Sequence, residues 1–183
     1  MNKLNLKCEG VKLWGDSQTK RRYNQTLKRV LDWVLGGSVI DIGGYSEFGD
    51  RMATRLSLEY NHTVHDLNYV KDYGPYYDYM FCFEVIEHLM NPLLFLEQLR
   101  FNKYIFLTYP YSPILQGKRH FHEMTPDQFY TLIDAAGLKI VHHDSFRNYL
   151  TPKIYFTGFR PLIKLVLQIL GLSKIHFYVL EKK

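Results

Sequence analysis

The 183-residue sequence predicts an α/β fold in which a mostly parallel β-sheet carries helices on both faces. Two observations lead to this expectation. Apolar, β-branched runs typical of buried strands alternate with segments in which apolar residues recur at helical spacing. Up to Pro110 the order is strand, helix, strand and again strand, helix, strand. Such alternation is typical of parallel strands joined by helical crossovers.

In the first half of the chain, apolar periodicity and glycines mark the elements. They predict a helix, a strand, a helix and a strand at residues 17–37, 38–43, 47–60 and 62–67. The first helix is basic and stops at two glycines. The second has apolar residues at steps of four, namely Phe48, Met52, Leu56 and Tyr60.

In the second half, strands and helices again alternate. The expected order is strand, helix, strand, helix, strand, helix, strand, at residues 78–85, 91–101, 103–110, 125–138, 139–146, 159–171 and 174–182. The helix over 125–138 has the clearest boundaries, with Thr125 as N-cap, Pro126 at its first position and Gly137 at its end.

Composition predicts one globular domain over 1–183, with a basic helical region at 1–37 and an apolar helical insertion at 151–172. The net charge of +5 favours anionic partners. Two cysteines without a CxxC pair suit a reducing compartment, and the first residues lack the apolar run of a signal peptide, so we expect a cytoplasmic protein.

The most apolar segment, 161–172, is too short to span a bilayer, so we expect no transmembrane segment. Basic residues surround it, and peripheral contact with a membrane surface is one interpretation. A helix packed on the sheet, or in a dimer interface, is the simpler one.

Two acids and a glycine pair point to a ligand at the carboxyl edge of the sheet. The first strand ends at Gly43-Gly44, where glycine allows close approach of the backbone, and Asp41 precedes the pair. The next predicted strand ends at Asp66, where an acid can accept both hydroxyls of a ribose. The alternatives are a plain turn at the glycines and an Asx turn or helix cap at Asp66. The two acids together favour a nucleoside, and neither GxxxxGK[ST] nor GxGxxG occurs.

Four segments in this order resemble the class I S-adenosylmethionine-dependent methyltransferases of the small-molecule-type branch, over residues 25–145. They are "VIDIGGYSEFG", "HTVHDL", "YYDYMFCFEVIEHLMNPLLFLEQL" and "KYIFLTYP", followed by "HFHEMTPDQFYTLIDAAGLKIV". The resemblance implies a Rossmann-like methyltransferase fold whose last strand is antiparallel. It also implies S-adenosyl-L-methionine as cofactor and S-adenosyl-L-homocysteine as product.

The resemblance also assigns roles to residues. Asp41, Gly43, Gly44 and Tyr45 would line the methionine end of the cofactor, Asp66 the ribose and Leu67 the adenine. Phe83 and Glu84 would close the site near the sulfonium. Two departures from the family pattern are visible. Tyr45 and Glu47 replace the later glycines of the loop, and we expect the bulk of Tyr45 to narrow it. Only 12 residues separate Asp66 from Asp78 (78 − 66), so the sheet should be shortened between its second and fourth strands.

The candidate catalytic residues are Glu84, His88 and His120, with the histidines as general bases for a hydroxyl acceptor. This favours O-methylation of a small molecule such as a sugar, a quinone or a lipid-linked intermediate. The simpler interpretation of Glu87 and His88 is that they are local caps that only shape this turn.

Two alternatives remain. Glu84, Glu87, His88 and His120 resemble the E-x-x-E-H motif and later histidine of small-RNA 3′-terminal 2′-O-methyltransferases, which implies a divalent cation and an RNA acceptor. A non-catalytic partner that keeps the fold without the cofactor is the other.

Overall fold

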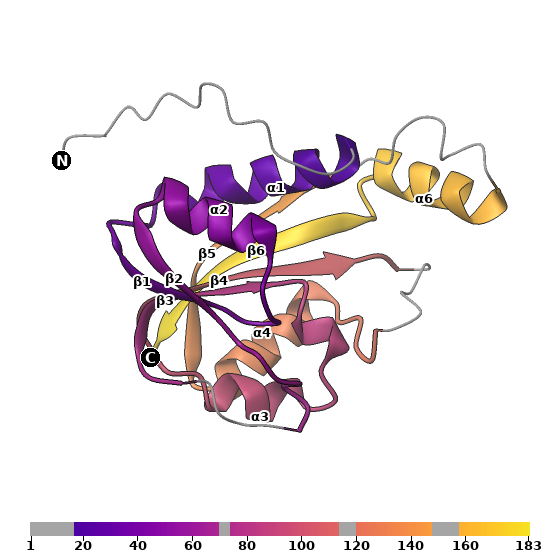
Figure 1. Ribbon diagram of the computed structural model, residues 1–183. Helices are drawn as coiled ribbons and strands as arrows, with labels where there is room; N and C mark the ends of the chain where they lie inside the picture. Colours follow the sequence, from indigo (N-terminus) through magenta and orange to yellow (C-terminus); the bar gives the residue numbers. More distant parts are fainter. Residues whose placement is uncertain (1–16, 70–73, 114–119, 148–157) are drawn as a thin grey trace.

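A computed structural model describes residues 17–69, 74–113, 120–147 and 158–183. They form a six-stranded sheet in the order β2-β1-β3-β4-β6-β5 (Figure 1). Strand β6 is antiparallel to both of its neighbours, and the pairs β1–β2, β1–β3 and β3–β4 are parallel. The predicted mostly parallel sheet with an antiparallel last strand is therefore confirmed.

The bounds of the elements follow the sequence signals closely in most places. The strands are β1 (Gly37–Asp41), β2 (Leu58–His62), β3 (Tyr77–Phe83), β4 (Phe101–Tyr111), β5 (Leu138–Phe146) and β6 (Lys174–Lys182). The helices are α1 (Ser17–Val30), α2 (Glu47–Arg55), the 3-10 turn η1 (Ile86–His88), α3 (Pro92–Glu97), α4 (Pro126–Ala135) and α6 (Phe159–Ile169). The N-cap predicted for α4 is present, since the Thr125 side chain accepts from the Gln128 amide.

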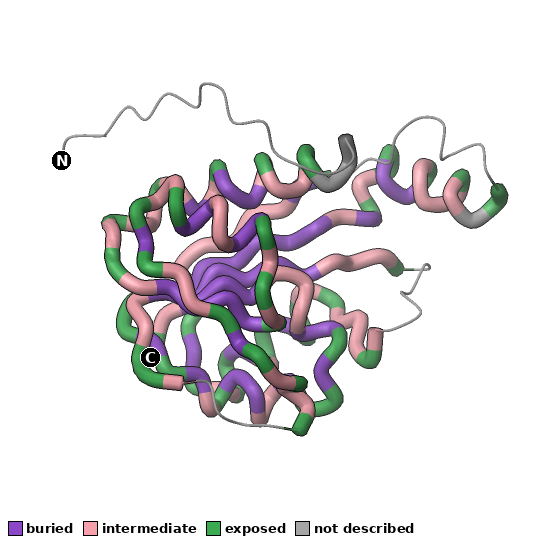
Figure 2. Tube along the Cα trace, in the orientation of Figure 1, coloured by how far each residue is buried: buried purple, intermediate pink, exposed green. Residues whose placement is uncertain are grey.

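Helices cover both faces of the sheet, with α1 and α2 on one face and α3 and α4 on the other (Figure 1). The alternation of side chains along the strands explains the two layers. In β3, Tyr79 and Phe81 pack with α1 and α2, whereas Met80 and Cys82 pack with α3 and α4. The purple segments of the central strands in Figure 2 show that this core is buried between the helical layers.

The expected boundary between the second helix and the second strand was wrong. Helix α2 ends at Arg55, and β2 covers Leu58–His62 instead of 62–67. Ser57 has φ 54°, a left-handed conformation that stops the helix before Leu58. Tyr60, expected on the apolar stripe of the helix, therefore lies on β2.

The shortened sheet is confirmed for the described part of the chain. Strand β2 lies at the sheet edge, and no strand separates it from β3 among the described residues of 63–76. Residues 1–16 of the basic N-terminal region and 151–157 of the apolar insertion lie outside the described residues.

Candidate functional site

The loop after β1 is held open by glycine and tied to the neighbouring strand. Gly43 and Gly44 have φ of 112° and 101°, which residues with a side chain rarely adopt. Both of their amides donate to Thr63 Oγ1 at 3.1 Å. Thr63 follows β2 directly, so the end of that strand shapes the loop, a role that the sequence did not reveal.

Asp41 is buried at the end of β1 and orients this loop. Its Oδ2 accepts from Ser46 Oγ at 2.5 Å and from Tyr60 Oη at 3.0 Å. Ser46 caps α2 in turn, because its hydroxyl accepts from the Gly49 amide at 2.9 Å. Burial is the main cause that raises the pKa of Asp41 to about 6, against the two hydrogen bonds, which lower it. The carboxyl group therefore links β1, β2 and α2.

Gly49 of α2 lies against the Asp41 carboxyl group, a role that the sequence did not reveal. A Cβ atom at this position would stand 2.2 Å from Asp41 Oδ2 and 2.8 Å from Ser46 Oγ. Such a distance is far below van der Waals contact, so only glycine lets α2 approach the Asp41 carboxyl group. In the sequence, Gly49 stands three positions after Ser46, within the segment 47–60 that was predicted to be a helix.

A cavity of about 180 Å³ opens beside this loop. Six of the eight predicted cofactor residues line it, namely Asp41, Gly43, Gly44, Tyr45, Phe83 and Glu84. Helix α1 supplies a wall that was not predicted, through Arg22, Tyr23 and Thr26. The Tyr23 ring stacks on Phe48 of α2, with centroids 3.9 Å apart. The basic character of 17–37 was the only sequence signal for this wall.

Tyr45 stands at the rim of the cavity. Its side chain is 61% exposed, and its ring packs edge-on against His62, with centroids 5.5 Å apart. It also contacts the Tyr60 ring edge-on, at 6.2 Å. Both contacts are with residues of β2.

Asp66 and Leu67 do not line this cavity. Because β2 ends at His62, Asp66 lies four residues beyond the strand (66 − 62) and not at its end as expected. Its Oδ1 accepts from the Asn68 amide at 2.9 Å, which is the Asx turn considered as the alternative. Leu67 packs against the core cluster of α3 and α4.

Glu84 follows β3 and faces α1 across the cavity. Its Oε2 accepts from Arg22 Nη1 at 2.6 Å, in an ion pair whose side chains are 27% and 29% exposed. Its φ of 57° is uncommon for a residue with a side chain, and its amide donates to Thr108 O of β4 at 3.0 Å. Such backbone conformations concentrate at functional sites, and Glu84 lines the cavity.

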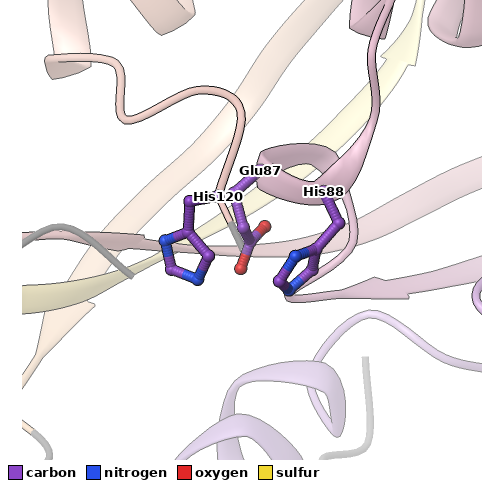
Figure 3. Close-up of side chains that lie close together, drawn as sticks. All are labelled: Glu87, His88 and His120. Atoms are coloured by element: carbon purple, nitrogen blue, oxygen red, sulfur yellow. The ribbon is translucent and has the colours of Figure 1, made fainter. Parts of the chain in front are cut away.

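A second group of side chains lies three residues further along the chain. Glu87, His88 and His120 each offer an atom within 4.8 Å of the others (Figure 3). Glu87 and His88 come from η1, and His120 from the segment before α4. The amides of Phe121 and His122 hold that segment in place, because both donate to Glu87 O, at 2.7 and 3.3 Å. Glu84, the fourth residue of the predicted metal set, is not part of this group.

Glu87 carries the most unusual electrostatics of the site. It is 1% exposed, and neither carboxyl oxygen has a hydrogen-bond partner among the described residues. Burial, and then the charges of Glu84 and Glu123, raise its pKa to about 8, against the opposing effects of its own backbone amide and of Arg22. A buried carboxyl without partners is costly. The neighbouring His120 is already engaged, since its Nδ1 lies 2.9 Å from Glu123 Oε1.

No protein-family model matches the sequence, and no curated protein matches it. Solved structures do. The complex between the Haloferax volcanii Trm112 methyltransferase activator and the methyltransferase contains a chain with TM-score 0.65 and 13% identity, over 90% of this chain and 92% of that chain. The O-methyltransferase from a Brevibacillus brevis trans-AT PKS multienzyme, in complex with S-adenosyl-L-homocysteine, has TM-score 0.63 and 11% identity, over 90% and 74%.

The [4+2]-cyclase SpnF has TM-score 0.63 and 11% identity, over 92% of this chain and 86% of that one. Identities of this size show the fold alone: a Rossmann-like fold shared with S-adenosylmethionine-dependent methyltransferases. The cyclase shows that the same fold also serves another reaction, so the chemistry must be argued from the site.

Proposed function

We propose that this protein is an S-adenosyl-L-methionine-dependent methyltransferase that acts on a hydroxyl group of a small molecule, such as a sugar, a quinone or a lipid-linked intermediate. The observation that carries the proposal is the position of the Glu87–His88–His120 group directly after the cavity wall. Glu84 lines the glycine-rich cavity, and η1 begins two residues later, at Ile86. A methyl donor bound in the cavity and a base in this group would then lie at the same edge of the sheet.

The cavity fits one end of the cofactor better than the whole of it. About 180 Å³ is smaller than the 300–1,000 Å³ of a typical small-molecule pocket. The two loop glycines let a ligand approach the backbone closely, and the Arg22–Glu84 pair carries charged groups suited to an amino acid. We therefore assign the cavity to the methionine end, beside Asp41, Gly43, Gly44 and Tyr45. Phe83 and Glu84 would lie nearest the sulfonium.

The adenosine end would extend from the cavity over the loop after β2. Asp66 is exposed there, its Asx turn uses Oδ1, and Oδ2 would accept from ribose hydroxyls. Leu67 would contact the adenine. No strand lies beyond β2 among the described residues, so this side of the adenine would be in contact with solvent.

Methyl transfer is an in-line displacement in which the acceptor oxygen gains the methyl carbon and the carbon–sulfur bond breaks, giving S-adenosyl-L-homocysteine. The hydroxyl proton must leave. His88 or His120 would accept it, and Glu123 would orient His120 and stabilise the imidazolium. Glu87, with its pKa raised to about 8, would stay protonated at neutral pH in the absence of a cation.

An activity assay tests this function. The protein is incubated with methyl-labelled cofactor and a panel of sugar, quinone and polyprenyl-linked hydroxyl acceptors. We expect label transfer with one class, and a loss of at least about tenfold in kcat for His88→Ala or His120→Ala. His122→Ala is the matched control, because it neighbours His120 but lies outside the group. Equal loss in the control, or transfer unaffected by both variants, would contradict a base in this group.

A second candidate is a divalent-metal-assisted RNA 2′-O-methyltransferase. The specific observation in its favour is the buried Glu87 carboxyl without a hydrogen-bond partner among the described residues, next to two imidazoles. One carboxylate and two histidines form a set that divalent transition metals accept. The set fits a cation after Glu87 loses its proton, and Glu84 would stay with Arg22.

Metal titration separates the two candidates. In the metal reading, Mn²⁺ at about 100 times its Kd raises the free energy of unfolding of the wild type by roughly 2.7 kcal/mol. His120→Ala removes this gain and His122→Ala keeps it. RNA methylation would also stop on addition of a chelator. A melting temperature indifferent to Mn²⁺ leaves the metal-free function.

A further inference from the structure

Helix α6 presents its apolar side to solvent. Phe159, Leu162, Val166, Ile169 and Leu170 follow the three-to-four-residue spacing of one helical face. All five are exposed, from 43% at Leu162 to 78% at Phe159. Figure 1 shows α6 beyond the N-terminal end of β6, to the side of the sheet.

The orientation of the helix is set by its other side. Leu167 and Gln168 are the buried residues of α6, at 4% and 2% exposure. Five large apolar side chains on one exposed face are unusual for a surface that only water contacts. We propose that this face docks on an anionic membrane surface, with α6 lying in the plane of the interface.

The charge of this part of the chain identifies the occupant. The sequence between Ser145 and Leu180 contains no Asp or Glu, while Arg147, Lys153, Arg160, Lys164 and Lys174 are basic. An anionic lipid surface complements both the apolar stripe and the positive charge. The overall net charge of +5 acts in the same direction.

The length of the helix fits a position at the interface. Eleven residues measure about 16 Å along the axis, roughly half of a hydrocarbon core. None of the described helices has both the length and the apolar character needed to cross a membrane. Lying flat is therefore the arrangement that covers the stripe.

The topology places α6 at the ligand edge of the sheet. Strand β5 runs in the same direction as β4 because both are antiparallel to β6. The chain leaves β5 at Phe146 and re-enters the sheet at Lys174, so α6 lies at the edge where β1 and β3 also end. Docking would bring the cavity edge toward the lipid surface. If the protein transfers methyl groups as proposed, this position favours an acceptor that is linked to a lipid. The docking itself does not depend on the proposed function.

Vesicle sedimentation with the full chain and no cofactor tests the docking. We compare vesicles of phosphatidylcholine with vesicles of an equal mixture of phosphatidylcholine and phosphatidylglycerol. We expect binding to the anionic vesicles that falls with added salt, and about tenfold or greater weakening in Val166→Asp/Ile169→Asp. Leu35→Asp is the matched control, since Leu35 is 90% exposed just before β1, at the opposite edge. It should bind like the wild type.

Several outcomes would overturn the proposal. They are no sedimentation with anionic vesicles, equal binding to neutral ones, or equal binding by the double variant. Light scattering tests whether a second copy of the chain covers this face instead. If the wild type forms a dimer and does not bind vesicles, and the double variant is a monomer, the face belongs to a second copy. If the double variant melts below the wild type, Phe159→Ser repeats the comparison at a ring that is 78% exposed. Because no cofactor is present, failure here leaves the proposed methyl transfer untouched.

Discussion

Arg22 of α1 and Glu84 after β3 form an ion pair across the mouth of the cavity, with Nη1 and Oε2 2.6 Å apart. The two residues are 62 positions apart in the chain. Their pairing fixes the N-terminal helix above the glycine loop. An α-amino acid carries one carboxylate and one ammonium group, and a guanidinium beside a carboxylate complements both. In the proposed function, the pair would hold the methionine end of the cofactor.

Arg22→Ala should weaken binding of S-adenosyl-L-homocysteine without weakening that of 5′-methylthioadenosine, which lacks the amino-acid group. A lost charge-assisted hydrogen bond corresponds to roughly 10- to 100-fold in Kd. Isothermal titration calorimetry measures both ligands. Arg21→Ala, an exposed neighbour on the same helix, should change neither affinity. An equal loss for both ligands would mean that Arg22 only supports the fold.

Gly49→Ala should destabilise the protein by about 2 kcal/mol or more, because the new methyl group would overlap the Asp41 carboxyl group. Urea unfolding gives the free energy directly. Thr54→Ala, at an exposed position of the same helix, serves as the control and should change stability by less than about 0.5 kcal/mol. Similar effects of the two substitutions would refute the close approach of α2 to Asp41.

Glu87→Gln should change how stability depends on pH. The folded-state pKa of Glu87, about 8, is above the unfolded value near 4.5, so the folded state binds the proton more tightly. The stability that this proton contributes is complete below pH 4.5 and is lost as the pH rises toward 8. The upper limit is about 5 kcal/mol.

Urea unfolding of both proteins at pH 5, 6.5 and 8 follows this loss. The variant lacks the titration, so its stability relative to the wild type should rise with pH. Asp41 titrates in both proteins, and its contribution cancels in the difference. A difference that stays constant across this range would show that Glu87 does not hold a proton in the folded state.

Most of the fold was predictable because its elements carry strong local signals. Thr125, Pro126 and Gly137 delimit α4, and the apolar run of 79–83 within the predicted strand 78–85 is typical of a central strand. The second strand was misplaced by four residues, since "LEYNH" has little apolar character and continues the helical spacing of Phe48 and Met52. The end of α2 depends on the left-handed conformation of Ser57, which no sequence pattern predicts.

The site was predictable only where it lies in a motif. Asp41, Gly43, Gly44 and Glu84 line the cavity as expected. The contributions of Arg22, Tyr23 and Thr63 come from segments that tertiary packing brings to the loop, so no local pattern could reveal them. The same holds for Glu84, which shares a motif with Glu87 but pairs with Arg22 and lies outside the Glu87–His88–His120 group.

The central claim is that the cavity after β1 binds S-adenosyl-L-methionine. The most direct measurement is calorimetric titration of the wild type and of Asp66→Ala with S-adenosyl-L-homocysteine. The account predicts one bound ligand per chain and weaker binding by Asp66→Ala, with the enthalpy of unfolding of the variant unchanged. An absence of binding by the folded wild type would contradict the claim and favour a non-catalytic partner with this fold.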